Sequence, residues 1–161
     1  MNRRTFTTTA LLGLVVATAL PQAGLAQSNR LIGTWKLNLE KSKYSPGPPP
    51  RSNTSIWEAV GQGLRSRGEG VDAQGNPTKT DSGVISFDGK SYPYTGSPAY
   101  DATSYKQVNA STFEFTRTKA GRAVQTSTMV FSADGKSFTV TTTGVDEKGQ
   151  QINNVVVFDK Q

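Results

Sequence analysis

The side chains that could carry chemistry in this 161-residue sequence are carboxylates, arginines and tyrosines, because it contains no histidine and no cysteine. Their absence removes the commonest general base, the thiolate nucleophile and the usual ligands of zinc and iron–sulfur clusters. Asp72, Asp88, Asp134 and Asp146 lie in predicted turns, where a carboxylate accepts hydrogen bonds from backbone N–H groups. We therefore predict no catalytic residue, no metal site and no cofactor.

One pair of acidic residues keeps an enzymatic hypothesis open. Glu58 and Glu69 flank the predicted turn 61–63 almost symmetrically, so they could face each other across adjacent strands. Two facing carboxylates can divide acid and base roles when their surroundings separate their pKa values. An enzyme that uses strand carboxylates or tyrosines is thus one alternative.

The aromatic residues of the central region suit the lining of a ligand cavity. Trp57 and the tyrosines each combine a large apolar ring with one polar atom. Glycine and proline in 93–98 predict an open loop beside them, as expected at a cavity mouth. Simple packing in half-buried strands is an equally good interpretation. The tyrosines concerned are Tyr92, Tyr94, Tyr100 and Tyr105.

Three arginines within predicted strands are candidates for binding a ligand anion. Arg65 and Arg67 are two residues apart and therefore share one face of a strand, and Arg117 lies in a later strand. An arginine that points into a barrel needs a carboxylate or a ligand, because a buried unpaired charge costs several kcal/mol. A solvated outer face is the alternative for all three.

The elements that position these residues are β-strands. After residue 26 no long segment has helical periodicity, and segments rich in Thr, Val, Tyr and Phe alternate with Gly, Asp and Asn turns. Short connections, including tight turns at Asp88-Gly89 and Asp134-Gly135, predict antiparallel neighbours. We expect an all-β, antiparallel up-and-down meander of about ten strands, closed as a β-barrel. The predicted strands are 31–37, 52–60, 63–72, 78–87, 90–95, 102–108, 111–118, 122–132, 136–144 and 150–159.

Composition adds two expectations about the barrel. A hydrophobic content of 34% is low for a densely filled interior and favours a partly polar lumen. The net charge of +6 is spread along the chain rather than clustered, which indicates a solvated surface and no nucleic-acid partner.

The N-terminal segment 1–26 has the pattern of a cleaved export signal. Arg3 and Arg4 precede an apolar run at 10–20, and Gly24-Leu25-Ala26 supplies small residues before a cleavage point. The run is too short to span a bilayer, so we expect no stable membrane insertion. The arginine pair followed by Phe6 also resembles a twin-arginine signal, with ordinary secretion as the alternative. We expect a bacterial periplasmic or secreted protein whose single domain is 27–161.

The first strand carries a family resemblance. Gly33-Thr34-Trp35-Lys36-Leu37, followed by a ten-stranded meander, resembles the calycin superfamily of lipocalins and fatty-acid-binding proteins. Together with Lys41-Ser42-Lys43 and Pro46-Gly47-Pro48 it is similar to bacterial exported lipocalin-like proteins. The resemblance implies structural roles for Gly33 and Trp35, with the indole closing the barrel bottom. In place of the two helices of fatty-acid-binding proteins, this chain has a proline-rich loop.

Two further hypotheses for the function follow from these features. In the first, the domain binds a small apolar or amphipathic molecule in its barrel, with Trp57, the tyrosines and one or more of the arginines as the pocket. In the second, it is an interaction or enzyme-inhibitor module, and the stiff proline loop 44–50 contacts a protein partner.

Overall fold

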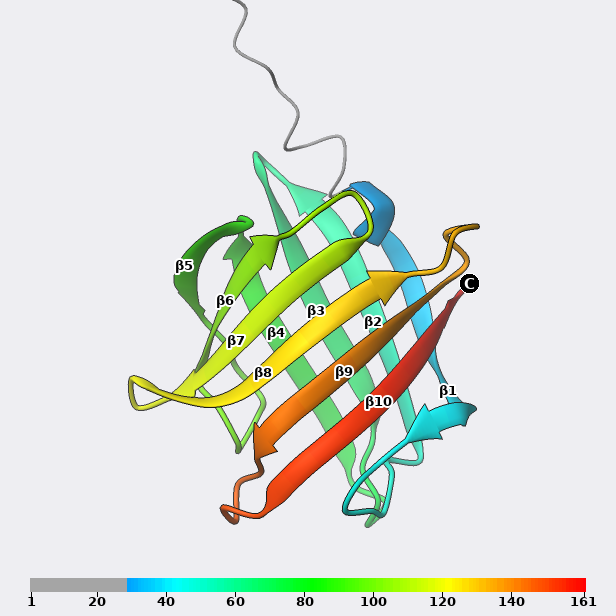
Figure 1. Ribbon diagram of the computed structural model, residues 1–161, viewed down its shortest axis with the longest axis vertical. Helices are drawn as coiled ribbons and strands as arrows, with labels where there is room; N and C mark the ends of the chain where they lie inside the picture. The colour runs from blue at the N-terminus through cyan, green and yellow to red at the C-terminus, as the bar shows by residue number, and fades with distance from the viewer. Residues whose placement is uncertain (1–28) are drawn as a thin grey trace, which may run out of the picture.

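The chain folds into a ten-stranded antiparallel barrel (Figure 1), which confirms the predicted all-β meander. The computed structural model describes residues 29–161, so the predicted export signal 1–26 lies outside the described residues. The strands are ordered β4-β3-β2-β1-β10-β9-β8-β7-β6-β5 around the sheet. They are β1 (Gly33–Lys43), β2 (Ser52–Val60), β3 (Gly63–Val71), β4 (Pro77–Ile85), β5 (Asp88–Pro93), β6 (Ala102–Gln107), β7 (Thr112–Lys119), β8 (Arg122–Phe131), β9 (Ser137–Val145) and β10 (Gln151–Lys160).

Nine strands begin and end within two residues of their predicted bounds, and β1 is the exception. Leu31 belongs to a short 3₁₀ turn, η1 (Asn29–Leu31), and the strand extends beyond residue 37 to Lys43. The extension is irregular: Ser42 Oγ donates to the Asn38 carbonyl (2.6 Å) and accepts from the Val157 N–H (2.9 Å). A side chain thus replaces ladder hydrogen bonds, which is why alternation did not reveal this half of the strand.

The predicted hairpin at Asp88-Gly89 is wrong. Both residues belong to β5, and β4 and β5 are the two edges of the sheet, joined by a single bridge between Asp81 and Thr95. Phe87 packs against Phe113 with 5.0 Å between ring centroids, so the connecting chain turns into the core instead of folding back along β4. The barrel is therefore nearly closed, with one seam.

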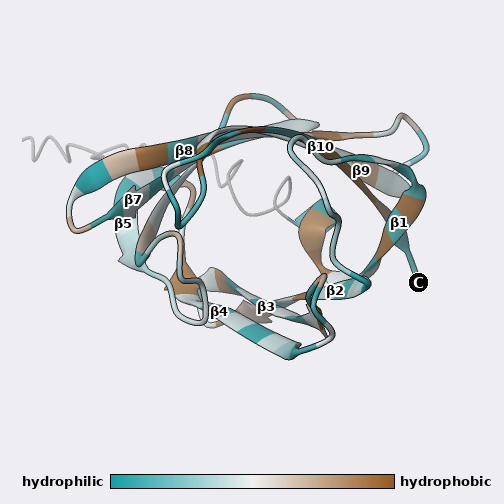
Figure 2. Ribbon diagram, turned by 90° about the horizontal axis from the view of Figure 1, so that it is seen from below, coloured by the Kyte–Doolittle hydropathy of each residue, from teal (hydrophilic) through white to brown (hydrophobic). Residues whose placement is uncertain are grey.

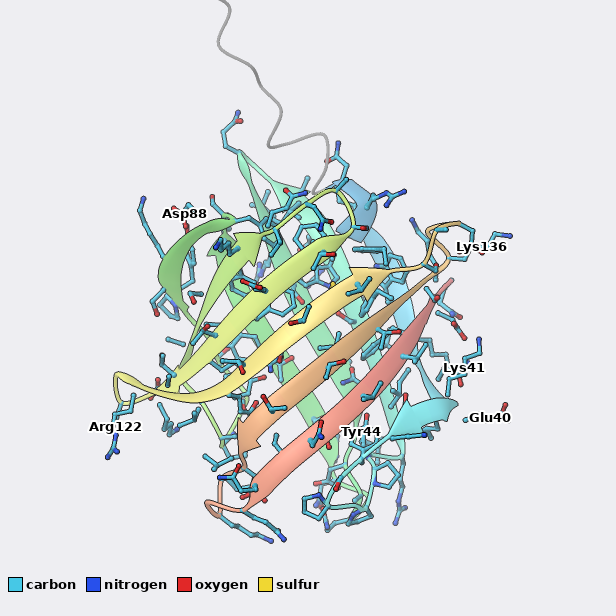
Figure 3. All side chains as sticks on the ribbon, viewed as in Figure 1. Glu40, Lys41, Tyr44, Asp88, Arg122 and Lys136 are labelled. Atoms are coloured by element: carbon cyan, nitrogen blue, oxygen red, sulfur yellow. The ribbon has the colours of Figure 1, made fainter. Side chains whose placement is uncertain are left out.

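The predicted turn at Asp134-Gly135 is confirmed. The Gly135 N–H donates to the Ser132 carbonyl (3.0 Å), and Gly135 has a φ of 68°, a left-handed conformation that glycine adopts without strain. The Asp134 carboxylate accepts from Ser132 Oγ (2.6 Å) and from the Lys136 N–H (3.0 Å). Arg122 is the first residue of β8, and Lys136 lies in the connection that follows the last residue of β8. Figure 3 labels both residues.

An aromatic cluster fills one end of the barrel. Trp35 is fully buried, with its ring 4.7 Å from Phe138 and 5.6 Å from Phe131. Its indole N–H donates a hydrogen bond to the carbonyl of Leu31 at 2.7 Å, which holds η1 against this end of the barrel. The Lys160 ammonium lies 5.1 Å from the Trp35 ring. This end is therefore closed by side chains.

The opposite end carries the loops β1–β2, β3–β4, β5–β6, β7–β8 and β9–β10, because strand direction alternates around the barrel. Figure 2 views the barrel from this side, and the strands form a ring around the axis. Within residues 29–161, no helix is long and apolar enough to span a membrane.

Replacing Trp35 with alanine should lower the free energy of unfolding by about 3–5 kcal/mol, because the cavity left behind collapses only partly. Trp35→Phe keeps a ring but leaves the Leu31 carbonyl unpaired, and should cost about 1–3 kcal/mol. Urea denaturation followed by circular dichroism measures both. Leu39→Ala, at a position 41% exposed on the same strand, is the control and should change stability by about 0.5 kcal/mol or less. Equal costs at residues 35 and 39 would contradict this account of the closed end.

Candidate functional site

A cavity of about 240 Å³ lies inside the barrel, between the aromatic end and the loops. Phe138 belongs to both the cavity wall and the cluster around Trp35, so the cavity begins where that cluster ends. Its apolar wall comes mainly from β7 to β10: Phe115, Met129, Phe138, Val140, Val156 and Phe158. Its polar wall is Tyr44, Asn53, Ser55, Trp57, Ser66, Thr80, Tyr94, Tyr100, Thr103, Tyr105, Arg117 and Thr142. The predicted partly polar lumen is thus present.

Arg117 is the one positively charged residue among the described residues that line the cavity. Its Nη1 donates to Ser127 Oγ (2.5 Å) and lies 3.5 Å from Gln125 Oε1. Ser127 in turn shares a 2.7 Å hydrogen bond with the hydroxyl of Thr142. None of the ion pairs found within residues 29–161 includes Arg117. The hydrogen-bond partners of its guanidinium are the neutral side chains of Ser127 and Gln125.

The segment between β5 and β6 brings two tyrosines to the cavity. The rings of Tyr94 and Tyr100 lie 4.9 Å apart, and the Arg117 guanidinium lies 5.0 Å from the Tyr100 ring. The segment crosses close over β4: a Cβ on Gly96 would come within 1.8 Å of the Lys79 carbonyl oxygen, and Gly96 has a φ of 84°. Only glycine satisfies both constraints, which explains a loop of this composition at this place.

The phenols of Tyr44, Tyr94 and Tyr105 in the cavity wall are protonated at neutral pH, and burial raises their pKa values further above the ordinary value of 10.0. Burial raises the pKa of Tyr105 to about 12 and the pKa of Tyr44 to about 12. Burial also raises the pKa of Tyr94 well above its usual range, while nearby Arg117 acts more weakly in the opposite direction. At neutral pH these residues therefore offer O–H donors to the cavity. Figure 3 marks Tyr44 just after β1.

Three buried polar atoms of the cavity wall have no hydrogen-bond partner. They are Asn53 Oδ1 and Trp57 Nε1 on β2, and Thr103 Oγ1 on β6. A buried donor or acceptor left unsatisfied costs about 1–3 kcal/mol, so most such groups in folded proteins are paired. All three belong to the wall of the same cavity.

Five of the predicted pocket residues line the cavity: Trp57, Tyr94, Tyr100, Tyr105 and Arg117. Tyr92 does not, because its ring packs beside Tyr105 and its hydroxyl donates to Asp88 (3.0 Å).

Arg65 and Arg67 also lie outside the cavity, on the outer face of β3. Arg65 Nε donates to Asp81 Oδ1 (3.0 Å), and Arg67 pairs with Glu58 (3.0 Å). The hydrogen bond from Arg65 holds the pKa of Asp81 below its usual range. Ser66 and Gly68 are the residues of β3 that face the lumen. The two arginines do share a face, as expected, but it is the solvated one.

The carboxylates Glu58 and Glu69 do not face each other. The β2–β3 turn places Val60 opposite Gly63, so Glu58 lies across from Arg65 and Glu69 across from Thr54. Glu58 is three residues before the predicted turn 61–63 and Glu69 is six residues after it, so this turn does not bring them opposite each other. No carboxylate lines the cavity among the described residues, and these contain no cluster of three or more acidic residues suited to a metal ion.

The sequence interpretation missed Asn53, Thr103 and Tyr44. Asn53 is four residues from Trp57 and Thr103 is two from Tyr105, so each shares the face of an aromatic residue that was already a candidate. Strand alternation was thus a sufficient signal for both. Tyr44 lies beyond the end of β1, where alternation gives no information.

The raised pKa of Tyr105 predicts a loss of stability at high pH. Because the pKa of this phenol in the folded state (about 12) exceeds its ordinary value of 10.0, the stabilisation is present below pH 10 and is lost as pH rises toward 12. In the Tyr105→Phe variant the free energy of unfolding should fall less steeply over this interval. Urea midpoints measured at several pH values test this, and identical slopes for the variant and the wild type would contradict it.

Comparison with protein-family models finds no match to this sequence, and comparison with curated proteins finds none either. The fold itself is an all-β, up-and-down barrel whose sheet is nearly closed.

Proposed function

We propose that this chain is an exported binding protein that holds a small, mostly apolar molecule with polar groups in its barrel cavity. The observation that carries the proposal is the set of three unpartnered polar atoms, all on the wall of one cavity of about 240 Å³. Several kcal/mol of stability are given up if these atoms stay unsatisfied, and a bound molecule offsets that loss.

The distribution of side chains supports an amphipathic ligand. Phe115, Met129, Val140 and Val156 offer an apolar surface, whereas Arg117 offers charged donors on the same lumen. Pockets that fix the orientation of a ligand combine an apolar lining with a few polar groups in this way.

The cavity volume limits the size of the ligand. Pockets for drug-sized molecules have volumes of about 300–1,000 Å³, and this cavity, at about 240 Å³, is smaller. A monocyclic molecule or a short chain suits this space better than a long acyl chain.

A second candidate function is the interaction module that acts through the proline loop. Pro46, Pro48 and Pro49 are exposed, and the loop is anchored at Ser45, whose carbonyl accepts from the Asn153 N–H (2.7 Å) and whose N–H donates to Asn154 Oδ1 (2.9 Å). A fixed, exposed loop loses little entropy on binding a protein. The unpartnered buried atoms all belong to the cavity wall and none belongs to the loop 44–50. The cavity is therefore the stronger candidate for the binding site.

Filling the cavity should abolish binding. Native mass spectrometry of the chain isolated from cells that produce it should show a bound small molecule that denaturation releases. Val140→Phe places a ring in the lumen and should reduce the loaded fraction at least about tenfold, since the volume is taken by the protein. Thr141→Phe, which adds the same ring to the exposed outer face of β9, should remain loaded.

Two results would contradict the cavity proposal. One is equal loading of the Val140→Phe and Thr141→Phe variants. The other is an unloaded wild type together with retention of a protein partner that is lost when Pro46, Pro48 and Pro49 are replaced by alanine, which would favour the interaction module.

A further inference from the structure

The charged group of the cavity and two of its unpartnered polar atoms lie on strands at opposite sides of the ring. In the ring order, β2 and β7 are separated by five steps in either direction around the ten strands. Asn53 and Trp57 on β2 therefore lie across the lumen from Arg117 on β7. We infer that the cavity takes a small carboxylic acid with a second hydrogen-bonding group, bound across the barrel with its carboxylate at Arg117. This inference rests on the proposed function and names the class of ligand.

The β7 wall is suited to one carboxylate. A guanidinium has five N–H donors in a planar fork, and the hydrogen bonds found for Arg117 all use Nη1. Its contacts with Ser127, Gln125 and the Tyr100 ring hold the group in place without neutralising it. A carboxylate matches the fork with two parallel hydrogen bonds. The protonated phenol of Tyr94 provides a further donor at the same cavity.

The charge of the wall also argues against other anions. Arg117 is the single Lys or Arg among the described lining residues, so a ligand with one negative charge is matched. A phosphate monoester carries about 1.5 to 2 negative charges at neutral pH and would keep part of its charge unpaired in a confined site. A neutral ligand would leave Arg117 as it is now, without an anion.

The β2 wall calls for a group that both donates and accepts hydrogen bonds. Asn53 Oδ1 is an acceptor without a donor, and Trp57 Nε1 is a donor without an acceptor. A hydroxyl group has one O–H donor and two lone pairs, so it can pair with either atom. Met129 on β8 and Val140 on β9 lie between β7 and β2 in the ring order, and with Phe115 on β7 they favour an apolar ring or short chain in the middle of the ligand.

The test uses matched probes on the chain without its export segment. The reference probe is 3-(4-hydroxyphenyl)propanoate, compared with its neutral carboxamide and with 3-(4-methylphenyl)propanoate, which lacks the hydroxyl. Affinities come from calorimetry and from intrinsic tryptophan fluorescence, to which Trp35 and Trp57 both contribute. We expect the acid to bind at least about tenfold more tightly than the amide, and about threefold or more tightly than the methyl analogue, since charge-assisted pairs are stronger than neutral ones.

Variants assign each preference to its wall. Arg117→Gln should remove the preference for the acid over the amide, and Arg117→Lys should restore part of it by keeping the charge. Arg67→Gln, on the outer face of β3, is the matched control and should leave both preferences intact. Asn53→Leu should reduce the preference for the hydroxyl group, since only Trp57 Nε1 is left to pair with it, and should leave the preference for the acid intact. Circular dichroism confirms that each variant is folded before its affinity is measured.

The outcomes separate this inference from the proposed function. Equal binding of the acid and the amide in the wild type would overturn the carboxylate assignment while leaving the cavity as a binding site. A preference for the acid that survives Arg117→Gln would overturn it as well. If no probe binds, including the shorter 4-hydroxyphenylacetate and 4-hydroxybenzoate, the ligand class is wrong. An unloaded protein in native mass spectrometry would then count against the cavity function itself.

Discussion

The barrel depends on the antiparallel pairing of β1 with β10, which joins the two ends of the described chain. Trp35 lies opposite Lys160 and Leu37 opposite Phe158. The hydrogen bonds along this edge of β1 therefore form only when β10, the last strand, pairs with it. The pairing brings the Trp35 indole against Phe131 and Phe138, from strands formed about a hundred residues later. Because contacts so distant in sequence cost chain entropy before they stabilise, the aromatic end must compensate with dense packing.

The interior of the barrel has two halves of different character, the aromatic end around Trp35 and the cavity nearer the loops. Inward residues near Trp35 are large and aromatic and fill the space, whereas those nearer the loops include serines, threonines and Arg117 and leave a cavity. The second half contains buried polar atoms without hydrogen-bond partners, which cost stability. Binding sites are commonly where a protein retains such unfavourable groups, because the ligand satisfies them.

The incomplete seam of the ring lies beside the same cavity. β4 and β5 are joined only by the bridge between Asp81 and Thr95, whose two N···O distances are 3.1 and 3.0 Å. Tyr94 comes directly before Thr95 and Tyr100 five residues after it, and both line the cavity. At the seam between β4 and β5 the strands share few hydrogen bonds, and the rings of Tyr94 and Tyr100 form part of the cavity wall there.

The strands and most of their bounds could be predicted from the sequence, because turns at Gly, Asp and Asn and alternation of side chains are local properties. The absence of histidine and cysteine likewise determined which chemistry is excluded. Alternation also showed that Arg65 and Arg67 share a face, but both faces of β3 are polar, so only the closed barrel decided that Ser66 faces the lumen. The opposition of Arg117 to Asn53 arises from the ring order of the strands, which depends on the pairing of distant segments and is absent from any local pattern.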